Sequence, residues 1–228
     1  MREMNPHQLV SLVSRLIPYG CLVFFLIPGL GLIGCKSQEQ KIQKLITQLA
    51  SEDAQARGEA ALELERIGEP AVPMLVKTLR DSNPSLRANV VWKLSEIGKP
   101  VEQVVPALIR ALGDAHENVR VSASLALAGM GVPAVPFLIE ALSDEEAAIR
   151  LHGAYALGEI GEPVEKIIPA LIGRLNDKEW NVRRVCVRAL VNIGEPAVPL
   201  LTEALNNSDP DTRRFAQIAL DQMKHRTR

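Results

Sequence analysis

The chain of 228 residues has few aromatic side chains, few cysteines and almost no net charge. Aromatic residues make up 4% of the sequence, and the formal net charge is -1 at pH 7. A near-neutral chain without a basic run lacks the phosphate-neutralising charge of a nucleic-acid-binding protein. Cys21, Cys35 and Cys186 are too few for a disulfide framework, and their spacing fits no zinc site. The hydrophobic share of 47%, rich in Ala, Leu and Val, favours close-packed helices.

The first 34 residues have the three parts of a secretory signal. Arg2 and Arg15 precede an apolar stretch over residues 16–34, which Pro18 and Pro28 interrupt. A transmembrane helix needs about 20 mostly apolar residues, and this stretch barely reaches that length. A positive start, a short apolar core and small residues at the end are typical of a signal peptide. An uncleaved signal anchor is the alternative, and both interpretations place the rest of the chain outside the cytoplasm.

The apolar stretch ends with Leu32-Ile33-Gly34-Cys35, which resembles the lipobox of bacterial lipoproteins. The resemblance implies cleavage of the signal peptide 1–34 and attachment of diacylglycerol and a fatty acid to Cys35. Residues 35–40 then form the lipidated end and a short tether. Several acyl chains anchor a protein stably, whereas one chain does so only marginally. We therefore expect an extracytoplasmic lipoprotein on the outer membrane or on the outer face of the inner membrane.

In residues 41–224, three sequence markers recur at the same spacing. Residues 225–228 form a basic tail. The markers are a proline, an arginine and an Ile-Gly or Met-Gly pair, and their spacing alternates between 33 and 30 residues. The alternation comes from a three-residue insertion that follows two of the glycines. The prolines are Pro73, Pro106, Pro136, Pro169 and Pro199, and the glycines are Gly68, Gly98, Gly131, Gly161 and Gly194.

Each repeated unit carries two helical patterns. The first pattern runs from the proline, because a missing N–H is tolerated in the first turn of a helix. The second is longer and ends at the glycine, which suits a helix C-cap. Acidic or amide residues before the second helix are expected to supply N-cap oxygens: Asp81, Asp114, Asp144, Asp177 and Asn207. Since a two-helix unit cannot bury its apolar face alone, about six units are predicted to stack into an all-α, monomeric α-solenoid.

These repeats resemble the short HEAT-like repeats of the phycobilisome-lyase type. The family pattern is Asp, six residues to Arg, then small-small-x-Ala-Leu-Gly-x-Ile-Gly. The fourth unit matches it with Asp144, Arg150, Gly153-Ala154, Ala156-Leu157-Gly158 and Ile160-Gly161. The resemblance implies an armadillo-like helical solenoid, a fold that serves scaffolds, chromophore lyases and hydroxylases alike.

Positions counted from the repeated arginine predict which residues pack in the core. Position +3 is always small, position +7 is always leucine and position +10 is Ile or Met, and the three lie on one helix face. Cys186 occupies a +3 position and is expected to be inert. The arginines are expected to bridge carboxylates or carbonyls at helix starts as a structural ladder, with anion binding as the alternative. They are Arg57, Arg87, Arg120, Arg150, Arg183 and Arg213.

Positions +2, +5 and +9 share another face and vary in character. In solenoids the second helices usually line the concave surface, where exposed Trp, Tyr and Arg are typical anchors for a partner. The alternative is that Trp92 and Tyr155 only cover the edge of the core, and Trp180 is expected to cap the core end. The candidate partner-binding residues are Asn89, Trp92, Glu96, Leu125, His152, Tyr155, Glu159 and Arg188.

Catalytic motifs are not recognisable in the sequence. It has no Gly-rich phosphate loop, nucleophile elbow or His-Glu-x-x-His. The pair His116-Glu117 resembles an iron ligand pair of deoxyhypusine hydroxylases, but those HEAT-like enzymes need several such pairs. Cys186 has no adjacent base. We therefore expect no catalytic residue, no metal and no cofactor.

The expected function is a non-catalytic scaffold. The solenoid would bind another protein of the cell envelope, and not nucleic acid, through its concave face. A phycobilin-lyase-like or tetrapyrrole-handling protein of the same repeat type is the alternative, and a structural envelope protein without a preferred partner is a third possibility.

Overall fold

The computed structural model describes the backbone of residues 30–226 and the side chains of residues 37–225. The predicted signal peptide, the lipidation of Cys35 and the end of the basic tail therefore lie outside the described residues in whole or in part. The described residues divide into two units, residues 30–44 and residues 45–226. The packing described below is that of the second unit.

Helices are the regular structure of the described residues, and no strand occurs among them. They pair in chain order into six two-helix repeats, α2/α3 to α12/α13. The helices are α2 (Leu30–Gln48), α3 (Ala54–Ile67), α4 (Val72–Thr78), α5 (Pro84–Ile97), α6 (Val101–Ala111), α7 (Glu117–Met130), α8 (Val135–Ala141), α9 (Ala147–Ile160), α10 (Val164–Ile172), α11 (Trp180–Ile193), α12 (Val198–Ala204) and α13 (Pro210–Arg226). The backbone of α2 is helical through residues 36–40, where the sequence predicts a tether.

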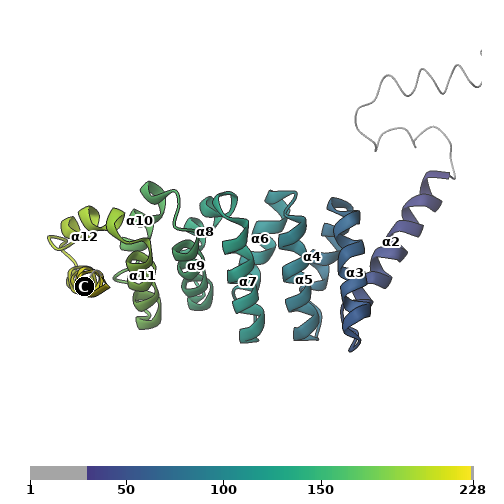
Figure 1. Ribbon diagram of the computed structural model, residues 1–228, viewed down its shortest axis with the longest axis horizontal. Coiled ribbons are helices and arrows are strands. Elements are labelled where there is room, and N and C mark those ends of the chain that lie inside the picture. The colour runs from purple at the N-terminus through teal and green to yellow at the C-terminus, as the bar shows by residue number, and fades with distance from the viewer. Residues whose placement is uncertain (1–29, 227–228) are drawn as a thin grey trace, which may run out of the picture. The chain divides into compact units, whose positions relative to one another are not determined.

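In the second unit, the second helices α3 to α13 form one layer, and the first helices α4 to α12 form the other (Figure 1). In residues 45–228, α5, α7, α9 and α11 pack directly against one another, while α4, α6, α8, α10 and α12 are in looser contact. A stack whose helices are closer in one layer bends toward that layer, so we call the surface of the second helices the inner face. The six-repeat α-solenoid predicted from the sequence is confirmed.

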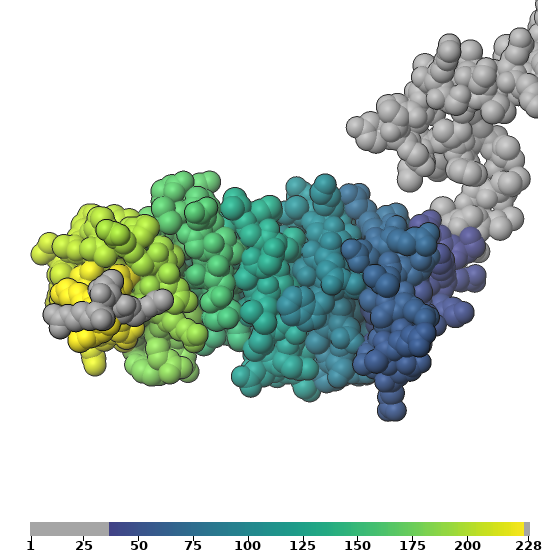
Figure 2. All heavy atoms as spheres, in the orientation of Figure 1, coloured from purple at the N-terminus to yellow at the C-terminus, as the bar shows by residue number. Residues whose placement is uncertain are grey.

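The core lies between the two layers and consists of the columns predicted from the repeat. The leucines at +7 from α3 to α11 have no exposed surface, and Leu220 in α13 is 8% exposed. The small +3 side chains are buried with them, including Cys186. Figure 2 shows that residues 45–225 form a continuous row of closely packed repeats in chain order. Each repeat therefore depends on its neighbours for the burial of its apolar side chains.

The joints between repeats alternate in structure as they do in length. Three short joints each hold a 3-10 turn, η2 (Glu69–Ala71), η3 (Val132–Ala134) and η4 (Glu195–Ala197), followed by a seven-residue first helix. The glycines before them have φ between 67° and 81° with ψ near -140°, a region that only glycine adopts readily. In the two long joints, Gly98 and Gly161 are in the ordinary left-handed conformation, and cis Pro100 and Pro163 follow.

Two expectations about the helix starts are wrong in detail. In the long units the inserted residues lengthen the first helix, so Pro106 and Pro169 lie inside α6 and α10 rather than at their start. The acidic or amide residues that the sequence predicts as N-caps also do not cap their helices; the N-cap residues of α5, α7 and α11 are Asn83, His116 and Glu179. Asp144, for example, accepts a hydrogen bond from the N–H of Glu146, and Glu146 is itself the N-cap residue. The carboxylate thus shapes the turn that leads into the helix.

Candidate functional site

The six repeated arginines bind the turn that precedes their own helix. In every repeat, Nη1 of the arginine donates to the two carbonyl oxygens that lie six and five residues earlier in the chain. For Arg150 these are the carbonyls of Asp144 and Glu145, both at 2.9 Å. The same pair of bonds is made by Arg57, Arg87, Arg120, Arg183 and Arg213. These contacts hold each turn against its helix.

Only Arg87 and Arg150 among them also bind a carboxylate of the next repeat. Nε and Nη2 of Arg87 donate to Asp114, both at 2.7 Å, and those of Arg150 donate to Asp177, at 2.8 and 2.9 Å. Both pairs cross a long joint and are 27 residues apart. Burial disfavours the charged carboxylates, but hydrogen bonds from the arginine and from a backbone N–H outweigh it, so the pKa values of Asp114 and Asp177 are lowered.

Arg183 precedes a short joint and forms no such ion pair within the described residues. Its Nε is buried and has no hydrogen-bond partner, and the corresponding residue of the next repeat is Asn207. The guanidinium carbon of Arg183 instead lies 5.2 Å from the centre of the Phe215 ring. A cation–π contact therefore replaces the ion pair between α11 and α13.

The partner-binding residues predicted from the sequence lie along the inner face, on α5, α7, α9 and α11. The +5 side chains are exposed or half-buried in each second helix, and Leu62, Trp92 and Leu125 are large apolar examples at 66%, 40% and 39% exposure. The other members of this column are Tyr155, Arg188 and Ile218. A column of mostly apolar and aromatic side chains, with Arg188 as its charged member, thus continues along the inner face.

Asn89, Trp92 and Glu96 line one depression between α3 and α5, with a volume of about 320 Å³. Asn89 is part of the framework as well, because its Nδ2 donates to the carbonyl oxygen of Leu49 at 2.9 Å. Glu96 forms an ion pair with Lys93, whose side chain is buried. Trp92 is therefore the apolar member of this group that is exposed to a partner, beside the exposed carboxylate of Glu96.

Tyr155, Glu159 and Arg188 meet in a shallow groove between α9 and α11. His152 lies on the same face of α9 and is half-buried. Burial lowers the pKa of His152, and the nearby positive charge of Arg120 lowers it further, against a smaller opposing effect of Glu117. His152 is thus held neutral more strongly than an exposed histidine. Leu125, on α7, is an exposed member of the same face.

The sequence predicted that Trp180 caps the end of the core. This prediction is wrong, because 53% of the surface of Trp180 is exposed. It begins α11, and the guanidinium carbon of Arg184 lies 4.9 Å from the centre of its ring. Trp180, Arg184, Arg188 and Arg214 line a groove of about 550 Å³ between α11 and α13. The sequence analysis identified only Arg188 here. The sequence does contain a signal for Arg184 and Arg214, because arginine recurs at position +1 in the last two repeats.

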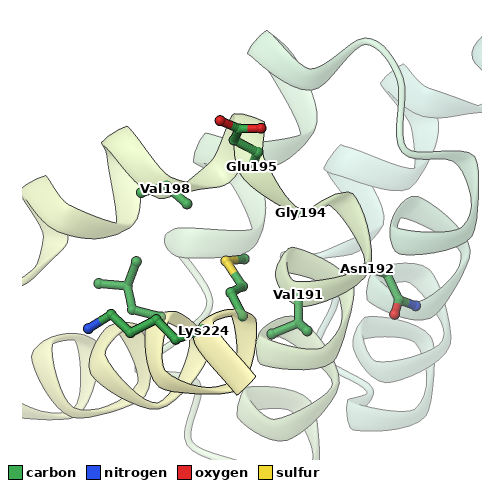
Figure 3. Close-up of a pocket in the computed structure, with 8 residues that line it drawn as sticks. Val191, Asn192, Gly194, Glu195, Val198 and Lys224 are labelled. Atoms are coloured by element: carbon green, nitrogen blue, oxygen red, sulfur yellow. The ribbon is translucent and has the colours of Figure 1, made fainter. Parts of the chain in front are cut away.

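A second hollow lies at the C-terminal end of the solenoid, between α11, η4, α12 and α13, and has a volume of about 560 Å³. Figure 3 shows Val191 and Lys224 on one side of it and Glu195 and Val198 on the other. None of the predicted partner-binding residues lines it. Its lining combines apolar side chains such as Val198 and Leu220 with the charged Glu195 and Lys224.

Residues with potential for catalysis or metal binding do not gather in the described part of the chain. No group of three His, Cys, Asp or Glu side chains is placed to hold a metal ion there. Burial raises the pKa of the Cys186 thiol to about 12, so the thiol stays protonated. His116 interacts with Arg87 and Asp114 of the arginine ladder.

Within the described residues no single helix has the length and apolarity of a membrane span. Two helix pairs pass the test of length and composition when taken together, Glu117–Met130 with Val132–Ala141 and Trp180–Ile193 with Glu195–Ala204, and they are bent by 114° and 117°.

Comparison with known proteins supports the repeat assignment. The model of the HEAT repeat family matches residues 42–115, 105–167 and 168–227. No curated protein sequence matches the chain. Among solved structures, the MAST/Orbit N-terminal domain is 20% identical with a TM-score of 0.55, over 79% of this chain and 96% of that one. A chain from a structure described as the basis of microtubule plus end tracking by XMAP215, CLIP-170 and EB1 is 19% identical with a TM-score of 0.54, over 78% of this chain and 89% of that one.

The complex of CpcE and CpcF of phycocyanin lyase from Nostoc sp. PCC7120 is 22% identical with a TM-score of 0.39, over 80% of this chain and 99% of that one. At these identities the likenesses concern the fold alone. The family match, in contrast, runs through all the repeats that carry the arginine ladder and the leucine column. This chain belongs to the HEAT repeat family.

Proposed function

We propose that this protein is an exported, lipid-anchored scaffold that binds another protein of the cell envelope on its inner face. The observation that carries the binding role is the column of exposed or half-buried side chains at +5, with Trp92, Leu125 and Tyr155 near its centre. Large apolar and aromatic side chains are the usual anchors of protein interfaces. The rigid stack presents them without an ordering cost on its own side.

The scaffold role is favoured over a tetrapyrrole-handling role by the character of the inner face. The depressions between α3 and α5 and between α9 and α11 are open or shallow, and the larger groove between α11 and α13 is also open to solvent, so each follows the gap between successive helices rather than enclosing a ligand. A chromophore requires a pocket that buries most of its surface. An extended protein segment, in contrast, fits a face that repeats the same side-chain column in each unit.

The interaction is tested by photocrosslinking in the native host. A photoreactive amino acid is placed at Leu125 or Tyr155 on the inner face, and at Glu140 or Lys166 on the first-helix layer as matched controls. We expect a crosslinked protein of one size from the inner positions only. In addition, Trp92→Ala with Tyr155→Ala should abolish the crosslink from Leu125 while leaving the circular dichroism spectrum unchanged. Equal crosslinking from both layers contradicts the proposal.

The anchor is tested separately by intact mass of the protein purified from host membranes. Loss of residues 1–34 with a lipid-sized increment on Cys35 is the expected result. Cys35→Ser should prevent both the cleavage and the increment. A full-length, unmodified mass contradicts the lipoprotein assignment and favours an uncleaved anchor.

A further inference from the structure

The groove between α11 and α13 differs from the rest of the inner face in its charge. Arg184 and Arg188 on α11 and Arg214 on α13 line it, and all three side chains are exposed. The lining contains no carboxylate, whereas Glu96 lines the depression between α3 and α5 and Glu159 the one between α9 and α11. Since the whole chain has a net charge of -1, this basic site is a local feature.

These three arginines form no ion pair with the described residues, in contrast to Arg87 and Arg150 of the ladder. Arg184 stacks over Trp180 at 4.9 Å, and Arg214 lies 5.9 Å from the centre of the Phe215 ring. Aromatic rings hold the guanidinium planes but do not use their N–H donors. The N–H donors of these groove-lining arginines therefore keep their preference for carboxylate or phosphate oxygens.

The floor of the groove is apolar. Val187 and Phe215 are buried there, and Val185 and Ile218 are half-buried. Trp180 adds an exposed ring at the edge. An inorganic anion or a lipid headgroup would use the arginines but leave this apolar surface in water. A peptide with both acidic and apolar side chains would use both.

We propose that this groove binds an acidic segment of the partner protein, with carboxylates on Arg184, Arg188 and Arg214 and an apolar side chain against Val187 and Phe215. The inference rests on the proposed function, because it names the chemistry of the partner at one end of the inner face. The volume of about 550 Å³ accommodates a few side chains, not a folded domain.

The test uses the full-length protein and a fluorescein-labelled synthetic peptide of alternating Glu and Ser around a central Leu-Phe pair. We expect saturable binding in fluorescence anisotropy, which weakens as the salt concentration rises. The double variant Arg184→Gln/Arg188→Gln should bind at least about tenfold more weakly, since it removes two of the three cations that would form charge-assisted hydrogen bonds with the peptide. The matched control, Arg80→Gln/Arg110→Gln, removes two exposed arginines outside the groove and should bind like wild type.

Peptide variants separate the proposed ligand from other anions. Replacing the central Leu-Phe by Ser-Ser should weaken binding if the apolar floor is used. Equal binding of that peptide, or displacement of the acidic peptide by inorganic phosphate at constant ionic strength, would assign the groove to simple anions and overturn the proposal. Equal affinity of the double variant and its control would overturn it too.

The outcome is distinguishable from a failure of the proposed function. If the crosslinks from Leu125 form but the acidic peptide does not bind, the scaffold role holds and the assignment of the groove is wrong. If the peptide binds while no inner-face crosslink forms, the groove is an acidic-peptide site and the wider inner face is not the interface.

Discussion

At the scale of single residues, the arginine ladder shows how one repeated side chain acquires two roles. All six arginines bind two carbonyls of their own turn, but only Arg87 and Arg150 reach a carboxylate of the next repeat. The difference comes from the joint between the repeats, because both ion pairs cross a three-residue insertion. The arginines at short joints keep the carbonyl bonds and form no ion pair with the described residues of the next repeat.

The contribution of the buried ion pair can be measured by replacing Arg150 with Met. Arg150 and Asp177 are each 4% exposed, so the substitution leaves a buried carboxylate without its counter-ion. We expect the free energy of unfolding in urea to fall by about 3–5 kcal/mol. Arg120→Met is the matched control, since Arg120 makes the same two carbonyl bonds without a carboxylate and should cost clearly less. Equal losses for the two variants would show that the carbonyl bonds carry the whole effect.

Protonation of His152 provides a second measurement at this scale. Burial and Arg120 lower its pKa below the ordinary 6.5, so the unfolded chain takes up the proton first as the pH falls. The stability of the wild type should therefore decrease as the pH drops below about 6.5, and this decrease should level off below the folded-state pKa. In His152→Gln the free energy of unfolding, measured in urea from pH 8 to pH 5, should depend less on pH. His225→Gln, which removes an exposed histidine, should retain the wild-type dependence.

At the scale of helices, the tight contacts across long joints explain why the inner layer is the closer-packed one. Gly158 on α9 faces Ala189 on α11 so closely that an added Cβ would lie 2.5 Å from the Cβ of Ala189 and 2.8 Å from its Cα. Backbone cannot yield at that distance without moving a helix. The small residue thus sets the separation of α9 and α11, the same pair that the ion pair of Arg150 and Asp177 connects.

A pair of glycine substitutions tests this contact. Gly158→Ala should destabilise the protein, because α9 and α11 must separate and lose packing. Gly129→Ala, inside α7 with nothing within 4 Å of the added Cβ, should instead stabilise it by about 0.5–1 kcal/mol through helix propensity. Thermal unfolding followed by circular dichroism gives both values. A loss of stability in both variants would mean that the contact at Gly158 is not the cause.

At the scale of the whole solenoid, each repeat interacts with its neighbours, so a defect in the middle should separate the two ends. Leu157 on α9 has no exposed surface. Trp92 on α5 and Trp180 on α11 lie on opposite sides of it along the stack and act as independent probes. In a linear array, stability depends on local terms and on the interfaces between repeats.

We expect Leu157→Asp to remove several kcal/mol of stability, about the cost of burying an unpaired charge-bearing group, and to uncouple the two sides. Trp92→Phe and Trp180→Phe each leave one fluorescent probe. In the wild-type background, the two probes should report one urea midpoint, and with Leu157→Asp they should report two. Leu157→Met, which nearly preserves volume, should keep a single midpoint. Coincident, unshifted transitions in Leu157→Asp would contradict the core position of this side chain.

The period of the prolines, arginines and glycines was enough to predict six two-helix repeats and their leucine core. The reason is that residues on one helix face recur at three- and four-residue spacing within each repeat, and the same positions recur in every repeat. The +5 column was recognisable for the same reason. The alternation of joint lengths was visible too, but not its consequence for ion pairing. That depends on how far successive second helices are displaced in space. Two further features also depend on contacts between repeats. The arginine-lined groove lies between α11 and α13, and the hydrogen bond from Asn89 to the carbonyl oxygen of Leu49 joins residues 40 positions apart.

The amino-acid sequence by itself therefore determined the repeat, the core columns and the face that lies outside the core, since these follow from local periodicity. Tertiary structure decided which of the six arginines find a carboxylate, that Trp180 is exposed rather than buried, and that three arginines surround an apolar groove. Each of these depends on the distance between side chains of different repeats. Such distances are set by the joints and by small residues such as Gly158, and no pattern within one repeat contains them.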